Sequence, residues 1–340
     1  MTTVTPQEAL SRIVHLLDRA HAPSYRVRAF ANAAVALADL SEAELRARVA
    51  AGTLTDLKGI GDTTARVITE ALAGEVPAYL AKLEDETVVP ISGAGAELRA
   101  QLRGDCHSHS RWSDGGADIA TMARTAAALG HEYLVVTDHS ARLTVAHGLD
   151  RERLLRQLEE VEALREELAP FRILTGMEVD IFEDGALDAD DDILARLDVV
   201  VASVHSKLRM DAKAMTERMV LAVASPHVDI LGHCTGRLIG KRPASEFDAD
   251  LVFAACAQFD TAVEINCRPE RLDPPTELLD LAIQWGCRFS IDTDAHAPGQ
   301  LEWLPFGCDR TAAAGIPPER VVNTMGADDL VAWAAAHGAA

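Results

Sequence analysis

The sequence predicts an α/β protein of repeated βα units, preceded by a smaller all-helical part. Beyond about residue 100, short β-branched runs alternate with helical runs, which is the pattern of parallel strands joined by crossover helices. The first 86 residues lack strand alternation and are rich in Ala, Leu, Val and Arg at helical spacing. A closed or nearly closed βα barrel of about seven strands is the economical arrangement, and an open doubly wound sheet is the alternative.

The helical part divides into four predicted helices and a glycine turn. The helices are expected over Gln7–Ala20, Arg26–Leu40, Glu42–Ala50 and Thr63–Ala73. Beyond Lys82 the sequence turns loop-like, with Pro90, Gly93 and Gly95. We therefore expect a helical domain over residues 1–86, a linker over 87–103 and the βα domain over 104–340.

The βα part contains a strand just before His107 and six more β-branched runs. These runs are Tyr133–Thr137, Ile173–Val179, Asp198–Val204, Val228–Leu231, Ala262–Ile265 and Arg288–Ile291. Helices are expected between them, among others over Arg151–Leu168, Met215–Ala224, Leu251–Phe259 and Thr276–Trp285.

Composition excludes several classes of protein. The 340 residues are 48% hydrophobic, which excludes wholesale disorder, and no apolar run is long enough to span a bilayer. The first residues do not resemble a secretory signal, and six Cys without regular spacing argue against a disulfide scaffold. We therefore expect a soluble, cytoplasmic protein.

The net charge of −21 is distributed unevenly. Residues 1–100 hold 10 Lys and Arg against 13 Asp and Glu, whereas residues 101–340 hold 22 against 40. A general nucleic-acid binder with a broad basic surface is excluded, because neutralising phosphates requires Lys and Arg.

Histidines and carboxylates gather where the predicted strands end. The set comprises six histidines, His107, His109, His139, His205, His233 and His296, and at least three carboxylates, among which are Asp114, Glu178 and Asp294. The carboxyl ends of parallel strands share one face, which carries the active site in barrel enzymes. Imidazoles with carboxylates suit Zn²⁺, Mn²⁺ or Fe²⁺. Nine ligands exceed the needs of one ion, so we expect two or three ions and at least one bridging carboxylate.

Other polar residues at these strand ends allow two interpretations. Asp105, Asp138 and Asp180 either orient metal ligands or are ordinary strand-end acids. Five histidines on or beside predicted helices are expected at the surface or in the core: His15, His21, His131, His227 and His337.

The succession of HxH, Asp-Gly, TDHS, GxE, a strand-end His, GH and TDAH resembles the PHP (polymerase and histidinol phosphatase) family over about residues 101–335. The resemblance implies a distorted (β/α)7 barrel with a trinuclear metal site. It assigns His107, His109, Glu178 and Asp294 to a first ion, with Glu178 bridging to a second ion that His205 and His233 also hold. It assigns Asp114, His139 and His296 to a third ion. The catalytic residues that it implies are Glu178, Asp294 and His296.

Within this family the chain looks most like the PHP domain of bacterial X-family DNA polymerases. The stretches that carry the likeness are Thr137–Gln157, Glu264–Asp273 and Asp294–Leu301. The helical part is similar to the N-terminal domain of those polymerases, including its helix-hairpin-helix. The linker is far too short to hold a polymerase palm, so DNA synthesis is not predicted.

The glycine turn of the helical part is a candidate DNA contact. Gly59 and Gly61 would present backbone N–H groups to a phosphate beside a helix N-terminus, with Lys58 and Arg66 flanking them. Such contacts fix position without reading base sequence. As the alternative, the turn is a generic junction between helices.

Together these features predict metal-dependent phosphoester hydrolysis at DNA 3′ ends, as a 3′–5′ exonuclease, 3′-phosphatase or AP endonuclease in DNA repair. Four cations that follow strand ends are candidates to hold phosphate oxygens: Lys207, Arg209, Arg237 and Arg268. The alternatives are a small-molecule phosphatase, such as a histidinol-phosphate phosphatase, and a non-catalytic protein that binds DNA structures. Nothing in the sequence indicates the oligomeric state.

Overall fold

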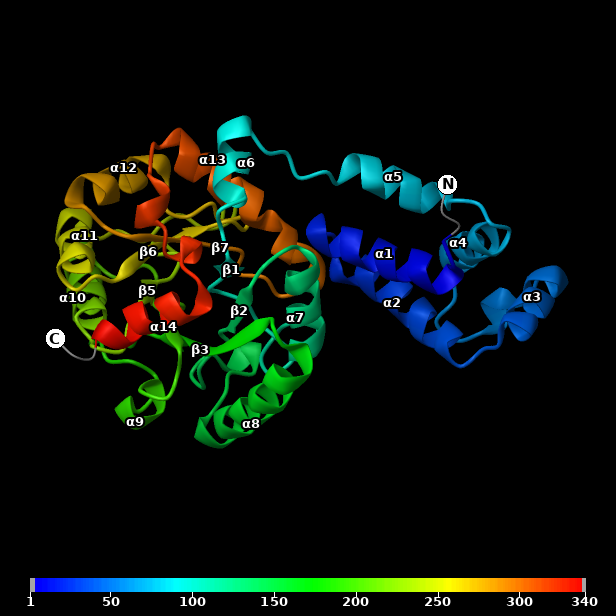
Figure 1. Ribbon diagram of the computed structural model, residues 1–340, viewed down its shortest axis with the longest axis horizontal. Coiled ribbons are helices and arrows are strands. Elements are labelled where there is room, and N and C mark those ends of the chain that lie inside the picture. Colours follow the sequence, from blue (N-terminus) through cyan, green and yellow to red (C-terminus); the bar gives the residue numbers. More distant parts are fainter. Residues whose placement is uncertain (1–3, 338–340) are drawn as a thin grey trace. The chain divides into compact units, whose positions relative to one another are not determined.

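A computed structural model describes residues 4–337 (Figure 1). Contacts between residues divide the chain into two compact units, residues 1–89 and 90–340. Residues 1–3 and 338–340, at the outer ends of the two domains we expected, lie outside the described residues.

The first unit is all helical. Its helices are α1 (Pro6–Arg19), α2 (Ser24–Ala38), α3 (Glu42–Ala51), α4 (Asp62–Leu72) and α5 (Ala78–Glu86), with a short 3₁₀ turn at Leu54–Asp56. α1 begins with a capping box, in which Thr5 and Glu8 satisfy each other's backbone N–H groups. Leu10, Ile13, Leu17 and Ile68 are fully buried where α1 packs against its neighbours. The four predicted helices are confirmed, and α5 is an addition to them.

The second unit contains seven parallel strands that pair in the order of the sequence. They are β1 (Gly104–Asp105), β2 (Tyr133–Val136), β3 (Arg172–Asp180), β4 (Val199–Ser203), β5 (Ile230–Leu231), β6 (Ala262–Asn266) and β7 (Phe289–Asp292). Just beyond β1 and β7, Ser108 and Ala295 form an isolated parallel bridge. The sheet is therefore a nearly closed barrel, as predicted, and the open doubly wound sheet is wrong.

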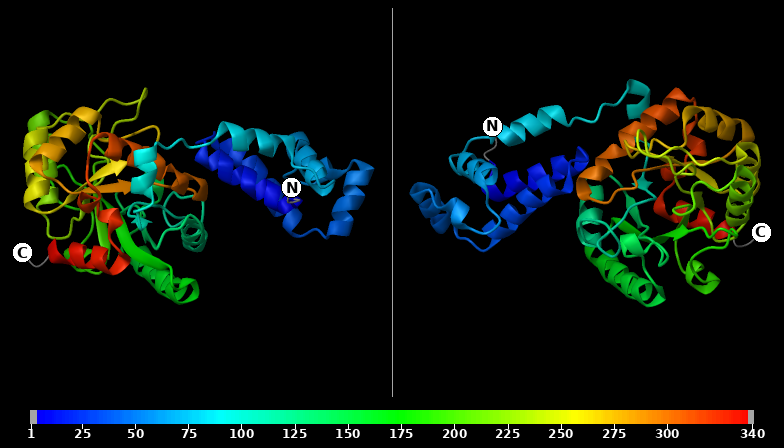
Figure 2. Two further views of the ribbon diagram at one scale, coloured as in Figure 1. Left: turned by 45° about the horizontal axis from the view of Figure 1, so that its top comes forward. Right: turned by 180° about the vertical axis from the view of Figure 1, so that it is seen from behind.

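Helices surround these strands (Figure 2). They are α7 (Ile119–Ala128), α8 (Arg151–Leu168), α9 (Asp191–Leu194), α10 (Ala212–Val223), α11 (Ala249–Gln258), α12 (Thr276–Trp285), α13 (Leu304–Ala313) and α14 (Ala327–Ala336). Within the segment that we expected to be a linker, residues 93–99 form α6 (Gly93–Arg99), which packs against α13. Its capping residue Ser92 donates its backbone N–H and its hydroxyl to Asp309.

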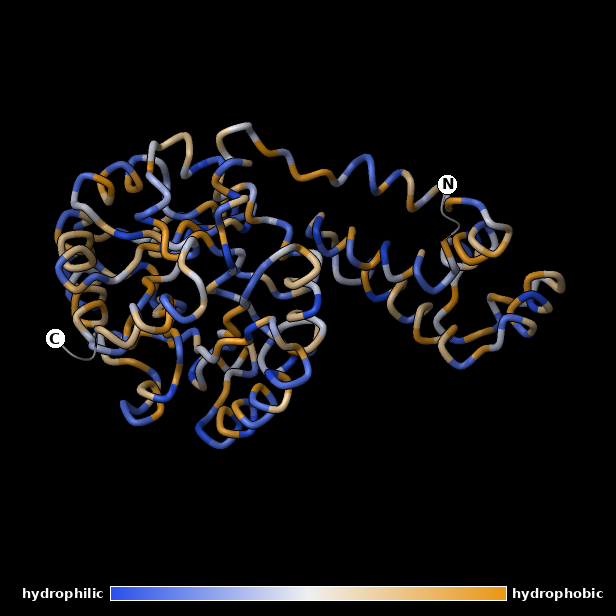
Figure 3. The backbone as a smooth tube through the Cα atoms, viewed as in Figure 1, coloured by the Kyte–Doolittle hydropathy of each residue, from blue (hydrophilic) through white to orange (hydrophobic). Residues whose placement is uncertain are grey.

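The barrel has an apolar end and a polar end. At the amino ends of the strands, Leu330 and Trp333 of α14 pack in one cluster with Tyr133, Val135 and Val201. Figure 3 shows the outer helix α8 changing between hydrophilic and hydrophobic colours along its turns, as expected of a helix with one face on the core. Since apolar side chains fill the barrel at the amino ends of the strands, the polar groups lie at the carboxyl ends. None of the helices within residues 4–337 combines the length and the apolar character needed to cross a bilayer.

Candidate metal centre

All nine residues expected as metal ligands meet at the carboxyl ends of the strands. Three overlapping groups have potential ligand atoms within 4.8 Å of one another: His109, Asp114, His139 and His296; His107, His109 and Asp294; His139, Glu178 and His205. The remaining residue, His233, places Nε2 2.9 Å from Oε1 of Glu178. The barrel brings together side chains that lie up to 189 positions apart in the sequence (His107 to His296).

Glu178, at the end of β3, lies at the middle of this cluster. Its Oε2 is 3.3 Å from Nε2 of His107 and 2.8 Å from Nδ1 of His139. Its Oε1 is 3.1 Å from Nε2 of His205, on the side where His233 also lies. Each oxygen of one buried carboxylate therefore faces a different group of imidazoles, which is the geometry of a bridging ligand.

Asp294 occupies the other side of His107 and His109. Its Oδ1 is 3.3 Å from Nε2 of His109 and 4.0 Å from Nε2 of His107. The backbone of Asp294 has φ +53°, a left-handed conformation that Asp tolerates better than most residues. This turn comes two residues after β7 ends and directs the chain toward His296.

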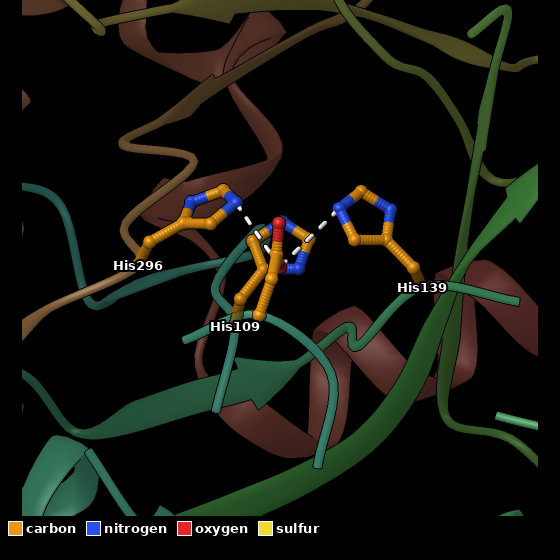
Figure 4. Close-up of side chains that lie close together, drawn as sticks. His109, His139 and His296 are labelled. Carbon is orange, nitrogen blue, oxygen red and sulfur yellow. Dashed lines mark ion pairs between the residues drawn. The ribbon is translucent and has the colours of Figure 1, made fainter. Parts of the chain in front are cut away.

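Asp114 completes a more open group. Its Oδ1 lies 3.6 Å from Nε2 of His139 and 3.4 Å from Nε2 of His296. Figure 4 shows His139 and His296 on opposite sides, with His109 between them. The side chain of His296 is 19% exposed and that of Asp114 is 34% exposed, whereas Glu178 is fully buried. The cluster is therefore more exposed to solvent on this side.

Buried carboxylates behind the cluster hold its ligands. Glu264 in β6 accepts a hydrogen bond from Nδ1 of His107 at 2.6 Å and another from the backbone N–H of His233. Asn266 donates to both Glu264 and Asp294. Glu264 and Asn266 were not predicted as site residues, because no histidine follows β6.

The three strand-end acids also contact the ligands or their loops. Asp180 accepts from the backbone N–H of His205 at 3.1 Å and lies 3.3 Å from its Nδ1. Asp105 accepts from the backbone N–H groups of His107 and Thr293. Asp138 accepts hydrogen bonds from the backbone N–H groups of Ser110 and Ser113, in the loop that carries Asp114. For these three acids the geometry favours the orienting role over the alternative of ordinary strand-end acids.

The electrostatics of the cluster keep its central carboxylate ionised and leave its imidazoles in different protonation states. Burial and the neighbouring His296 and His139 lower the pKa of His109 to about 3, so this imidazole is neutral. Burial alone raises the pKa of Glu178, but His205, His107 and His139 outweigh it and hold that pKa well below its usual value. Burial opposes the charged form of His205, yet Glu178 and Asp180 raise its pKa to about 9, so a metal ion there competes with a proton.

The residues present fit a metal centre. Within residues 4–337, both carboxylate oxygens of Glu178 are buried and have no hydrogen-bond partner. The same is true of ring nitrogens of His107, His109, His139, His205 and His233. Buried polar atoms without partners are costly, and divalent cations would satisfy both oxygens of Glu178 and one nitrogen of each imidazole.

The four expected phosphate-binding cations differ in their placement. Arg268 places NH1 3.8 Å from Oδ2 of Asp294, at the cluster. Lys207 and Arg209 are exposed on the loop after β4. Arg237 donates Nε and NH2 to the backbone carbonyl oxygens of Arg271 and Leu272, so two of its guanidinium nitrogens hold a loop.

Arg271 is a cation that the sequence analysis missed. Its Nε lies 3.2 Å from Oδ2 of Asp294, and its side chain is only 12% exposed. Its position three residues after Arg268, in the same strand-end loop, was the available signal.

The glycine turn of the helical unit forms a tight hairpin before α4. Gly59 has φ +98°, and a Cβ at this position would lie 3.2 Å from the carbonyl oxygen of Asn32, so glycine is required. Gly61 caps α4 without a side chain, which leaves first-turn N–H groups open, although its own N–H is bonded to Thr64. Lys58 and Arg66 are exposed beside it.

Comparisons with known proteins agree with both units. A helix-hairpin-helix domain model matches residues 5–76, and a PHP domain model matches residues 105–266. The chain is 41% identical over 233 residues to the DNA polymerase/3'-5' exonuclease PolX of Bacillus subtilis (strain 168). That match covers 68% of this chain but only 41% of the relative.

Shorter proteins are also similar. A probable phosphatase of Acetivibrio thermocellus is 30% identical over 230 residues, which cover 65% of this chain and 90% of that relative. A solved structure of histidinol phosphate phosphatase from Lactococcus lactis, complexed with zinc, L-histidinol and phosphate, is 20% identical with a TM-score of 0.46. This match covers 64% of this chain and 95% of the Lactococcus chain. By its sequence, barrel and ligand cluster, the chain belongs to the PHP-domain family of metal-dependent phosphoesterases and carries an N-terminal helix-hairpin-helix domain.

Proposed function

We propose that this protein hydrolyses phosphoester bonds at DNA 3′ ends in DNA repair. The observation that carries the proposal is the helix-hairpin-helix unit joined to a phosphoesterase barrel with a complete set of nine ligands. The named 3'-5' exonuclease among the relatives supports the same substrate class, since its match extends over 233 residues, 68% of this chain.

The ligand geometry supports two or three divalent ions, of Zn, Mn or Fe. Glu178 would bridge the first two, with Asp294 at the first and His205 and His233 at the second. Asp114, His139 and His296 would hold the third. Ions at these positions supply Lewis acidity that activates water and neutralises phosphate charge.

The chain's own groups would position the substrate around this centre. Glu178, Asp294 and His296 are the catalytic residues we propose, because they would hold the ions that neutralise the reacting phosphate. The guanidinium groups of Arg268 and Arg271 lie beside Asp294 and are placed to bind non-bridging phosphate oxygens. Lys207 and Arg209 would extend this positive edge outward along the loop after β4.

The hairpin would hold the DNA backbone near the cleaved end. The open N–H groups at the start of α4 and the cations Lys58 and Arg66 suit phosphate oxygens. Arg26 and Arg46, two other cations of this unit, are already engaged by the hydroxyl of Tyr79 and by Glu42. The contact is therefore small, and binding should be weak and salt-dependent.

A small phosphate ester is the second candidate substrate. The similarity to a probable phosphatase over 90% of that protein's length favours it. It would explain the barrel equally well but leaves the helical unit without a role.

The test is to incubate the protein with Mn²⁺ and oligonucleotides ending in a 3′-hydroxyl or a 3′-phosphate, and in parallel with L-histidinol phosphate. We expect turnover at the DNA ends, and weaker DNA binding when residues 1–89 are removed. Turnover of L-histidinol phosphate with none of DNA would overturn the DNA proposal. Glu178→Gln serves as the inactive control.

A further inference from the structure

One of the nine ligands is supported differently from the others. Glu178 lies in β3, and most of the other ligands directly follow a strand, but Asp114 lies within the loop of residues 110–116. Its carboxylate is also the most exposed of the three carboxylates in the set. The place of Asp114, and so the outer group that it forms with His139 and His296, depends on what holds this loop.

Asp138 holds the loop of residues 110–116 through hydrogen bonds. Its Oδ1 accepts hydrogen bonds from the backbone N–H groups of Ser110 at 2.8 Å and Ser113 at 3.1 Å, and its Oδ2 accepts from the hydroxyl of Ser110 at 2.6 Å. Asp138 immediately precedes the ligand His139. One carboxylate thus ties the Asp114 loop to the end of β2.

Helix α8 supplies the rest of the support. Gln157 donates to Oδ2 of Asp138 at 2.6 Å, and Arg153 donates to the carbonyl oxygen of Trp112. The indole N–H of Trp112 donates to Glu160 at 2.9 Å. Positions 153, 157 and 160 are spaced four and three residues apart, so they lie on one face of the helix.

Arg153 also joins this loop to the next one. Its NH1 donates to the carbonyl oxygens of His147 and Gly148, in the loop between β2 and α8. Leu149 in turn donates its N–H to the carbonyl oxygen of His139 at 2.7 Å. The guanidinium therefore holds the loops that carry both Asp114 and His139.

We propose that the face of α8 formed by Arg153, Gln157 and Glu160 positions the ligands of one ion alone. This outer ion is the one that Asp114, His139 and His296 would hold. The inner ligands His107, His233 and Asp294 are held by Glu264 and Asn266, which this face does not contact. Weakening the α8 face should therefore release the outer ion and leave the inner ions in place. This inference rests on the trinuclear site proposed above, but it is read from metal binding and not from the identity of the substrate.

The experiment measures ions per chain, and their affinities, by Mn²⁺ titration of the full-length metal-free protein and elemental analysis. Arg153→Met should weaken binding of the outer ion by up to about tenfold, the low end of the effect of losing a direct partner of a metal ligand, because Arg153 acts through the loop backbone. The affinities of the inner ions should be unchanged. Trp112→Phe, which removes the indole N–H together with part of the ring, should act in the same direction by a few-fold. Phosphoester hydrolysis by Arg153→Met should recover as Mn²⁺ is raised.

Two variants calibrate this result. Arg156→Met, on the same helix, removes only an exposed ion pair with Glu152 and should bind all ions like the original protein. Asp114→Asn should lose the outer ion outright. Unchanged affinities in both Arg153→Met and Trp112→Phe, or an equal loss of every ion, would overturn the inference. An Asp114→Asn protein that keeps every ion would instead remove the outer ion itself from the proposed site.

Discussion

The two units of this chain carry their functional groups in opposite ways. In the barrel, imidazoles and carboxylates are buried together at one end, and within residues 4–337 many of their atoms have no hydrogen-bond partner. In the helical unit the interior is apolar, and the candidate DNA contacts are backbone N–H groups and exposed cations of a surface hairpin. A buried charged site needs ions and supporting carboxylates, whereas a surface site needs only the right backbone shape. Four predictions test this contrast.

The largest effect is expected from Glu178→Gln. The change removes the charge that faces imidazoles on both sides, so we expect hydrolysis of a chromogenic phosphodiester to fall about a thousand-fold, or ~4 kcal/mol. Glu162→Gln, at an exposed position of α8, is the matched control and should be fully active. Retention of activity within tenfold would show that the barrel does not depend on its buried charge.

Removing metal should separate the two units. Without ions the buried carboxylates and imidazoles lose the cations that balance their charge. Chelation should therefore lower the free energy of unfolding of the barrel by about 3–4 kcal/mol, as for loss of a bound species present near 1,000 times its Kd. The helical unit should be unaffected. Hydrogen exchange read separately over residues 4–89 and 90–337 measures both, and an equal change in the two units would contradict the contrast.

Glu264→Gln tests the support behind the inner ligands. The amide cannot accept from His107, His233 and Asn266 together, so metal affinity should fall about 10–100-fold. Competition with a metal-binding dye gives the affinity. The control Glu277→Gln, in the first turn of α12, should leave it unchanged; the same loss there would mean that Glu264 has no special role.

The smallest effects are expected at the hairpin. Lys58→Ala and Arg66→Ala should each weaken DNA binding a few-fold and lower the slope of log affinity against log salt by about one. Neither should change hydrolysis of the chromogenic phosphodiester. Fluorescence anisotropy over a salt series measures the slope, and an unchanged slope in both variants would exclude the hairpin as a DNA contact.

Much of the fold followed from local patterns. All seven strands and the helices that we expected between them are present, because βα alternation dictates parallel neighbours and the residues needed for each strand lie within a few positions of one another. The ligand cluster was also predictable, since histidines and acids recur directly after strands. α6 was missed because Gly93 and Gly95 look like loop residues, whereas its packing against α13 compensates for their low helix propensity.

The sequence by itself determined the barrel, the nine candidate ligands and the glycine hairpin, because each depends on residues that are close together in the chain. Only the tertiary structure decided which atoms meet. It placed Glu264 behind His107, turned Arg237 toward backbone carbonyls, brought Arg271 to Asp294, and set one face of α8 against the Asp114 loop. These contacts join residues that are distant in the chain, and burial made them selective, since a buried polar group must find its partner wherever the fold supplies one.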